Sequence, residues 1–378
     1  MTLKDDDIDD IKFADEGESK EESNLEEIPR EKRVLRTQAY DKSVSDLVAM
    51  MEGDNKDIFL DPHYQRSYIW DNKKASLLVE SILLNVPIPV IYVAEDEDSR
   101  WNVVDGLQRL NSLRRFFDNE FKLTGLEVLP ELNRLQFSTL NPKAQRLLKN
   151  GILRVIVILQ ESHPEIKYDI FLRLNRGAVR LNEQELRNCL YRGSLNTFIK
   201  ELRKEKKFQE ILGLKSPHPR YIDAELALRS LALTQCFDAK TGTINNYAGK
   251  MKGFLNSFMH ENQNMSDDKT AKLRESFVAS LTSASEVFGN DAFRRIDAKT
   301  RVAERQLNRA IFDLVMVGFS SYSLDKISAN KKEIIELFVQ LPENDKKFLD
   351  AITYGTNDKA KVEYRLSTWT RELSKLLK

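Results

Sequence analysis

The chain has little cysteine and no long apolar run, and both absences limit what it can be. Its 378 residues include two cysteines, Cys189 and Cys236, which excludes a disulfide scaffold and a cysteine-rich zinc site and suits a reducing compartment. No apolar run approaches the roughly 20 residues needed to cross a bilayer, since Arg154 interrupts the candidate at 151–159. The start is acidic, which excludes a secretory signal with its basic start and apolar core. We therefore expect a cytoplasmic protein with no membrane partner.

The formal net charge of zero hides an uneven distribution of charge. Residues 1–28 contain 12 acidic and 3 basic residues, a net charge of −9, whereas residues 29–378 contain 47 acidic and 56 basic residues, a net charge of +9. A mildly basic body is compatible with a polyanionic partner. The alternative is an ordinary solvated surface beside a disordered tail.

Residues 1–28 are poor in aromatic residues and rich in Asp, Glu and Ser. Such a segment cannot bury enough apolar area to offset its ordering entropy, so we expect a disordered acidic leader whose removal leaves stability nearly unchanged. This leader is either a plain solubilising tail or a shield over a basic cleft of the same chain.

Residues 38–160 mix helical and extended patterns. Apolar residues at helical spacing predict three helices, and Pro87 and Pro89 end the second of them. β-rich runs predict short strands, two of which form a hairpin across the polar stretch 95–100. The expected helices span 44–51, 73–85 and 107–117. The expected strands span 58–60, 90–94, 101–104 and 152–159.

After Pro164 the pattern is almost wholly helical. Helices are expected at 165–174, 183–191, 194–210, 222–237, 247–261, 267–288, 304–319, 330–340 and 360–377. The sequence therefore predicts an α+β class, with a small α+β domain over 38–160 followed by a mostly α-helical domain over 161–378.

A first candidate motif, Val-Asp-Gly-Leu-Gln-Arg at 104–109, lies where a strand ends and a helix begins. Asp105 can cap that helix, and Gly106 lets the backbone approach a ligand without a Cβ clash. The free N–H groups of the first turn favour an anion, and Arg109 can hydrogen-bond a phosphate with its planar fork. The alternative is an ordinary Asp-Gly turn with an arginine salt bridge nearby.

A second motif, Tyr-Gln-Arg-Ser-Tyr-Ile-Trp at 64–70, precedes a helix. Tyr64 and Arg66 can stack on bases, and Gln65 can read a base edge. The alternative is an aromatic anchor for the following helix, with Arg66 on the surface, and Trp70 fits the core better than a ligand site.

A third motif joins Phe-Leu-Arg-Leu-Asn-Arg-Gly at 171–177 to Leu-Asn-Glu-Gln-Glu-Leu-Arg at 181–187. Asn175 and Gly177 suit the end of a helix, and Asn182 can cap the next one. Phosphate contact and structural capping remain equally open for this segment. The basic residues that gather in it are Arg173, Arg176, Arg180 and Arg187.

The order of these motifs resembles a known family. The array YQRSYIW, SILLNVPIPVIYV, VVDGLQRLNSLRRFF and IFLRLNRGAVRLNEQELRN, with the later segments RYIDAELALRSLAL and NNYAGKMKGFLNSFM, strongly resembles the GmrS-type N-terminal domain of GmrSD restriction endonucleases over about residues 40–320. Asp105, Gly106, Gln108 and Arg109 match the family's D-G-Q-Q-R nucleotide motif. Leu107 departs from it, which puts one polar contact in doubt.

The resemblance implies a ParB/sulfiredoxin-like fold for the α+β domain and a nucleoside triphosphatase, using Mg²⁺, that senses DNA, usually modified phage DNA. Asp105 and Arg109 would be catalytic, Asp105 by ordering the loop or a Mg²⁺-bound water, and the residues that bind the metal itself are left open. The residues implied to bind the nucleotide are Gln65, Arg66, Gly106, Gln108 and Arg109. Those implied to contact DNA are Tyr64, Gln65, Arg173, Asn175, Arg176 and Arg180.

The histidines argue against a built-in HNH nuclease, which family members carry as a fused or separate partner. None of His63, His163, His218 and His260 begins an Asp-His-x-x-Pro or His-Asn-His-like cluster. We also find no Walker A loop and no P-E/D-x-K pattern. We therefore expect a sensor subunit of a restriction or phage-defence system, with a separate HNH nuclease subunit and a homo-oligomer as candidate partners. The rivals are a non-catalytic DNA- or protein-interaction module of the same fold and a stand-alone ParB-like nuclease.

Overall fold

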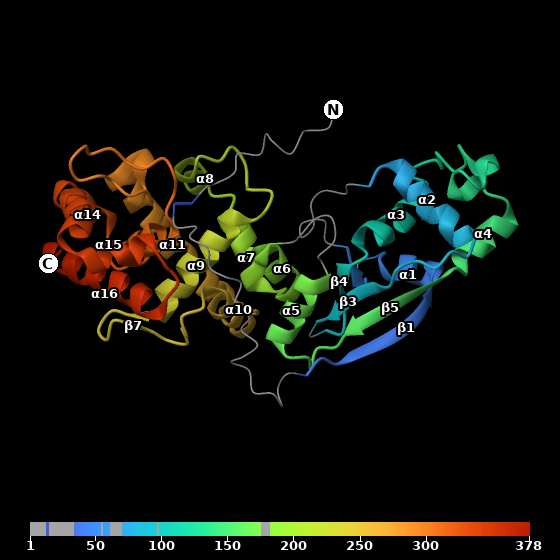
Figure 1. Cartoon of the computed structure of the whole chain (residues 1–378), viewed down its shortest axis with the longest axis horizontal. Helices are drawn as coiled ribbons and strands as arrows, with labels where there is room; N and C mark the ends of the chain where they lie inside the picture. The colour runs from blue at the N-terminus through green and yellow to red at the C-terminus, as the bar shows by residue number, and fades with distance from the viewer. Residues whose placement is uncertain (1–12, 15–33, 54–55, 61–69, 97, 175–181) are drawn as a thin grey trace. The chain divides into compact units, whose positions relative to one another are not determined.

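A five-stranded mixed β-sheet organises the first of two compact units of the chain (Figure 1). The structure, a computed structural model, describes residues 13–14, 34–53, 56–60, 70–96, 98–174 and 182–378. The unit that contains the sheet spans Leu25–Leu190. The second unit spans Tyr191–Lys378, and Phe13 and Ala14 belong to it.

The strands of the sheet lie in the order β1-β5-β3-β4-β2. β1 with β5 and β3 with β4 are antiparallel pairs, whereas β3 with β5 and β2 with β4 are parallel. The predicted hairpin and the predicted buried strand are therefore confirmed. The bounds are β1 (Thr37–Ser43), β2 (Ile58–Phe59), β3 (Ile91–Glu95), β4 (Trp101–Asp105) and β5 (Ile152–Ile158).

The edge strand β1 is not predicted by its sequence, TQAYDKS, because that run lacks the apolar alternation of a half-buried strand. Its side chains are mostly exposed, and its place in the sheet comes from pairing with β5. Asp41 lies directly opposite Arg154 in this pair, and two hydrogen bonds of 2.9 Å join them.

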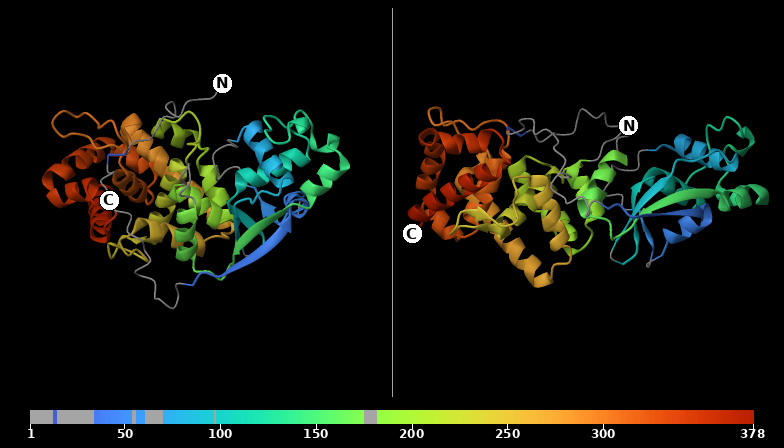
Figure 2. Two further views of the ribbon diagram at one scale, coloured as in Figure 1. Left: turned by 45° about the vertical axis from the view of Figure 1, so that its right-hand side comes forward. Right: turned by 60° about the horizontal axis from the view of Figure 1, so that its bottom comes forward.

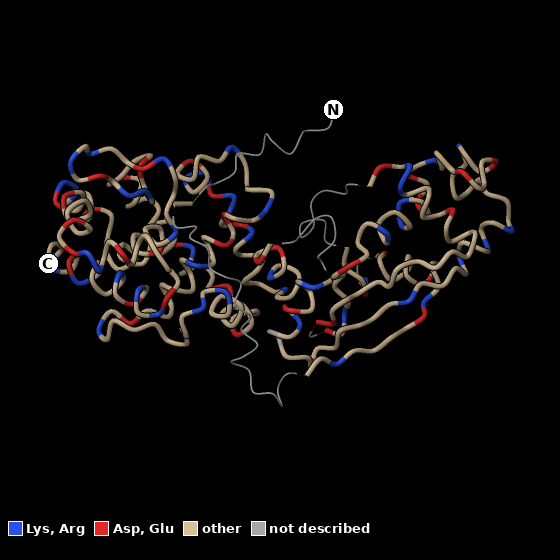
Figure 3. The backbone as a smooth tube through the Cα atoms, in the orientation of Figure 1, with Lys and Arg blue, Asp and Glu red and all other residues tan. Residues whose placement is uncertain are grey.

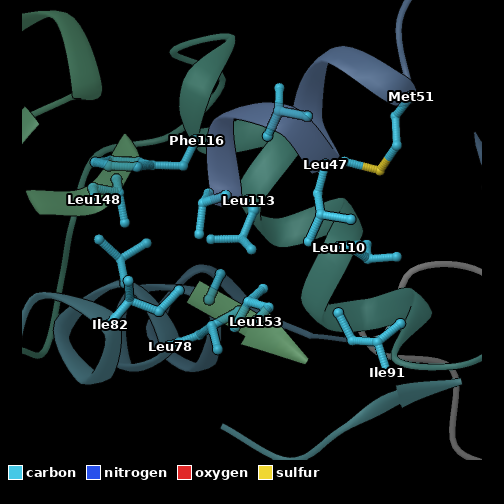
Figure 4. Packing of buried hydrophobic residues seen from close by; sticks show 14 of the residues in the cluster. Leu47, Met51, Leu78, Ile82, Ile91, Leu110, Leu113, Phe116, Leu148 and Leu153 are labelled. Atoms are coloured by element: carbon cyan, nitrogen blue, oxygen red, sulfur yellow. The ribbon is translucent and has the colours of Figure 1, made fainter. Parts of the chain in front are cut away.

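Four helices pack with one face of the sheet and form the larger core of this unit. Figure 4 shows Leu78, Leu110 and Leu148 from three of these helices gathered with Leu153 of β5. The helices are α1 (Val44–Met50), α2 (Asn72–Leu83), α3 (Leu107–Phe117) and α4 (Pro142–Lys149), with the short 3-10 helices η4 (Pro130–Leu132) and η5 (Phe137–Thr139) before α4. The first three confirm predicted helices, whereas α4 is not predicted.

On α3 the fully buried aromatic side chain is Phe116, whereas Phe117 is only partly buried against the same core. Phe117 instead stacks on Phe137 of η5, with 4.4 Å between the ring centroids. The helical stripe alone does not reveal this second aromatic contact.

Two further helices, α5 (Pro164–Leu174) and α6 (Glu183–Leu190), pack with the other face of the sheet. Successive side chains of a strand face opposite sides, so Val103 joins the larger core while Val104 joins this smaller one. The sheet unit consequently extends to Leu190, beyond the end expected at residue 160. The other buried members of the smaller core are Ala94, Ile158, Tyr168, Phe171 and Leu186.

The second unit is mostly helical, as predicted, and Figure 2 shows its helices from two further sides. Its one small hairpin among the described residues is formed by β6 (Phe237–Asp238) and β7 (Thr243–Ile244). The helices are α7 (Ser194–Leu202), α8 (Lys206–Leu212), α9 (Ile222–Cys236), α10 (Met251–Glu261), α11 (Asp267–Phe288), η6 (Gly289–Asp291), α12 (Arg309–Phe319), α13 (Leu324–Ala329), α14 (Lys331–Asn344), α15 (Lys346–Thr353) and α16 (Lys359–Leu376).

Several predicted helix limits are wrong, and side-chain hydrogen bonds explain two of them. The predicted helix at 194–210 is interrupted between α7 and α8, where Arg203 donates to Asp223 at 2.8 Å and to the carbonyl of His218. The predicted helix at 304–319 begins only at Arg309, because the side chain of Asn308 accepts a hydrogen bond from the Ile311 N–H at 3.0 Å and caps the helix there.

A buried ionic triad joins three helices of this unit. The carboxylate of Asp313 on α12 accepts from Nε of Arg229 on α9 at 3.1 Å and from Nη2 of Arg365 on α16 at 2.9 Å. All three side chains are almost fully buried. Burial by itself lowers the pKa of both guanidinium groups, but the nearby carboxylate raises the pKa of Arg229 overall while that of Arg365 stays lowered. The Asp313 carboxylate is thus the shared ionic partner of two buried guanidinium groups.

Candidate functional site

The first sequence motif lies at the junction where β4 ends at Asp105 and α3 begins at Leu107. Gly106 between them has φ 103° and ψ 6°, a left-handed conformation that favours glycine. A Cβ added there would lie 3.0 Å from Cγ1 of Ile91 and 3.3 Å from Nη2 of Arg109. Glycine is required by the backbone turn and by this close packing of protein atoms, whereas the sequence suggested that it makes room for a ligand.

Asp105 does not cap α3, contrary to the sequence expectation. The N-cap residue is Gly106, and no side chain caps this helix. The Asp105 carboxylate instead accepts a hydrogen bond from Nη2 of Arg109 at 3.0 Å, and its side chain remains 45% exposed. The arginine one turn along the helix draws the carboxylate away from the capping position, because an ion pair with a buried guanidinium is the stronger contact.

The guanidinium group of Arg109 donates its hydrogen bonds to acceptors of the protein itself. Its Nη1 donates to the carbonyl of Pro89, and its Nη2 donates to the carbonyl of Val90 at 3.3 Å as well as to Asp105. The side chain is 11% exposed, and burial lowers its pKa while the Asp105 carboxylate opposes that shift. Arg109 therefore connects the start of β3 to the start of α3, which is the salt-bridge alternative that the sequence left open.

The first turn of α3 offers backbone donors. Within the part of the chain that the structure describes, the N–H groups of Leu107 and Arg109 meet no hydrogen-bond acceptor. Gln108 lies beside them, and its Oε1 accepts from the Trp70 N–H at 3.4 Å. Trp70 packs partly buried against the larger core, as predicted. The junction thus brings an exposed carboxylate next to donors that can receive an anion.

Replacing Gly106 with alanine is expected to lower the free energy of unfolding of the sheet unit by about 1–3 kcal/mol, because the new Cβ meets both a positive φ and Ile91. Denaturant unfolding measures the loss. Gly53→Ala is the control, since Gly53 has φ 79° and no atom lies within 4 Å of its added Cβ. Equal losses for the two variants would show that contact with Ile91 does not constrain the junction.

The three site candidates of the second motif, Tyr64, Gln65 and Arg66, lie outside the described residues, so their predicted roles stay predictions. The same holds for Asn175, Arg176 and Arg180 of the third motif.

The described residues of the third motif divide between surface and interior. Arg173 is exposed on α5 and pairs with Asp169 at 2.8 Å. Arg187 is fully buried and pairs with Glu183 at 3.0 Å, so it does not belong to an exposed basic cluster as the sequence suggested. Helical periodicity placed Arg187 on α6 but did not reveal which side of that helix is covered. Asn182 accepts from the Glu185 N–H at 2.8 Å and caps α6, which confirms the predicted cap.

Nowhere in the described ranges do three His, Cys, Asp or Glu side chains gather so that they could hold a metal ion. Among the helices that the structure describes, none is both long enough and apolar enough to cross a membrane.

The comparison with known families covers this junction. Residues 44–192 match the family model of the GmrSD restriction endonuclease N-terminal domain. The match begins at the first residue of α1 and ends just after α6, so it includes both faces of the sheet and the β4–α3 junction. No curated protein and no solved structure matches the chain. Residues 44–192 therefore form a domain of the GmrSD N-terminal family, a family of restriction systems.

Proposed function

We propose that the chain is a sensor component of a restriction or phage-defence system that binds and hydrolyses a nucleoside triphosphate and interacts with DNA. The observation that carries this proposal is the position of the family's nucleotide motif, which falls at the β4–α3 junction inside the matched domain. Strand-to-helix turns of this kind receive phosphate groups because the N-terminal N–H groups of the helix are free.

The junction fits a Mg²⁺–nucleotide complex better than a bare phosphate. Asp105 offers an exposed carboxylate, and Mg²⁺ in nucleotide sites needs only one or two carboxylates beside the substrate phosphates. The Leu107 and Arg109 N–H groups are available to a phosphate oxygen. The metal, when bound, offsets the charge of the phosphates, which lets a carboxylate stand next to them.

Arg109 is a positioning residue in this proposal. Its two nitrogens already donate to Asp105 and to the carbonyls of Pro89 and Val90, so it fixes the carboxylate and the turn. The Gln108 side chain accepts a hydrogen bond from the backbone of Trp70, the last residue of the second motif. As the resemblance implies, Gln65 and Arg66 would line the nucleotide site, and Tyr64 would contact DNA with Arg173, Asn175, Arg176 and Arg180.

We further propose that the sheet unit has a ParB/sulfiredoxin-like fold and that a separate HNH subunit cuts DNA. A homo-oligomer is compatible with this arrangement. The rival function is a non-catalytic interaction module, and the engagement of Arg109 with the protein's own carbonyls is the observation that favours it.

Asp105→Asn is expected to lower nucleoside triphosphate turnover of the full-length protein at least about tenfold, because the carboxylate charge that would hold the metal is removed. The fold is expected to persist, since the amide oxygen still accepts from Arg109. Turnover is measured with each common nucleoside triphosphate and Mg²⁺, with and without duplex DNA, and melting is followed in parallel.

Asp118→Asn is a matched control for this variant. Asp118 pairs with Arg114 at 2.8 Å in the same helical spacing, but at the opposite end of α3. It should leave turnover unchanged. Absence of nucleotide binding and turnover in the unmodified protein would favour the interaction module, and equal turnover in both variants would remove Asp105 from the site.

A further inference from the structure

An aromatic residue of the acidic leader is anchored on the helical unit. Phe13 is 4% exposed and forms a parallel β-bridge with Leu307. The Ala14 N–H donates to the Leu307 carbonyl at 2.8 Å, and the guanidinium carbon of Arg309 lies 3.7 Å from the centroid of the Phe13 ring. The sequence indicated too little apolar burial to order residues 1–28, but at Phe13 the structure has a buried side chain that a backbone contact and a cation–π contact hold in place.

The segment that receives Phe13 is rich in arginine. Residues 294–309 contain six basic and two acidic residues. Two of the arginines are paired, Arg295 with Glu304 at 2.7 Å and Arg301 with Glu336 at 2.8 Å. Lys299 and Arg305 are exposed, and no carboxylate of the described residues pairs with either of them. Figure 3 shows Lys and Arg interspersed with Asp and Glu along the described backbone, and residues 294–309 carry an excess of positive charge.

Hydrogen bonds to neighbouring segments fix the conformation of residues 294–309. The Asn308 N–H donates to the Phe293 carbonyl at 2.8 Å, and Nδ2 of Asn308 donates to the Ile352 carbonyl at 2.8 Å. Arg294 donates to the carbonyl of Asn290 at 2.6 Å. The surface on which Phe13 sits is thus held by the rest of the helical unit.

The chain on both sides of the anchor carries the opposite charge. Residues 5–18 include eight acidic residues and one basic residue. Their covalent attachment to Phe13 keeps these carboxylates at a high effective concentration near the arginine-rich segment. An external polyanion must then compete with the chain's own acidic residues.

We propose that residues 294–309 are a polyanion-binding surface that the acidic N-terminal leader occupies in cis, with Phe13 as its anchor. The leader thereby lowers the affinity of the chain for DNA until it is displaced. This inference rests on the proposed function only for the identity of the polyanion, because the anchor and the charges stand independently of the nucleotide site.

The test compares the full-length protein with its Phe13→Ala variant in binding to a short duplex DNA and to heparin at low salt. If the leader occupies the site in most molecules, only the remaining molecules can bind an external polyanion, and the apparent affinity is lowered in the same proportion. We therefore expect Phe13→Ala to bind both polyanions at least roughly fivefold more tightly. Adding Arg305→Glu to this variant should remove most of the gain. Phe13→Leu keeps an apolar side chain but loses the cation–π contact with Arg309, so its affinities should lie between those of the unmodified protein and Phe13→Ala.

Hydrogen exchange reports docking directly. The Ala14 amide should be protected in the unmodified protein and exchange freely in Phe13→Ala. A freely exchanging Ala14 amide in the unmodified protein would overturn the anchor, and lost protection without any gain for DNA or heparin would overturn the competition. A gain for heparin with no DNA binding by any variant would retain this inference and reject DNA as the ligand.

Discussion

Asp313→Ala is expected to lower the free energy of unfolding of the helical unit by about 3–5 kcal/mol, because it leaves two buried guanidinium groups without their carboxylate. Arg229 and Arg365 have side-chain exposures of 2% and 0%, so water cannot replace the lost partner. Arg365 also donates to the Ala351 carbonyl at 3.3 Å, so its displacement would disturb the α15–α16 packing as well.

The loss is measured by denaturant titration with hydrogen exchange in α9, α12 and α16. Glu336→Ala serves as the control, since it breaks an exposed pair with Arg301 and should cost less than about 1 kcal/mol. A change below about 1 kcal/mol for Asp313→Ala would show that the helices accommodate two unpaired cations, against the usual cost of such burial.

Arg109→Ala is expected to lower the free energy of unfolding of the sheet unit by about 2–4 kcal/mol, because charge-assisted hydrogen bonds to two carbonyls and one carboxylate are lost. The sequence motif by itself suggests the opposite outcome, a folded protein that fails to bind nucleotide. Melting of the full-length protein and hydrogen exchange in β3 and α3 distinguish the two outcomes.

Arg114→Ala is the matched control for Arg109→Ala. Arg114 lies on the same helix and also pairs with an aspartate, but its side chain is 32% exposed. We expect its loss to cost less than about 1 kcal/mol. If Arg109→Ala melted like Arg114→Ala and lost nucleotide binding, Arg109 would be a direct phosphate ligand after all.

The secondary structure that could be predicted is the part dictated by local periodicity. The apolar spacing of α2, α3 and α9 and the β-branched run of β5 identify those elements from short windows of sequence. β1 could not be found in this way, because its exposed side chains carry no apolar alternation and its partner lies more than a hundred residues away in β5. The α7–α8 break depends in the same way on a distant contact, between Arg203 and Asp223.

The turn at the candidate site could be predicted from the sequence, but the contacts within it could not. The Asp-Gly pair after a β-rich run places a turn before α3, and the structure has that turn at Gly106. The pairing of Arg109 with the Pro89 and Val90 carbonyls depends on how β3 enters the sheet beside β4. No pattern along the chain encodes that approach.

The sequence by itself determined the α+β class, the helical character of the C-terminal unit and the turn at Gly106, because each depends on residues close together in the chain. It also revealed the family of residues 44–192, through the order of several motifs along the chain. Only the tertiary structure decided that Arg109 clamps the protein's own backbone, that Asp313 serves two buried arginines, and that Phe13 sits on Arg309. These contacts depend on which polar groups are desolvated when segments distant in the sequence pack together. Desolvation makes an unpaired charge costly, so each buried charged group requires a hydrogen-bonding or ionic partner.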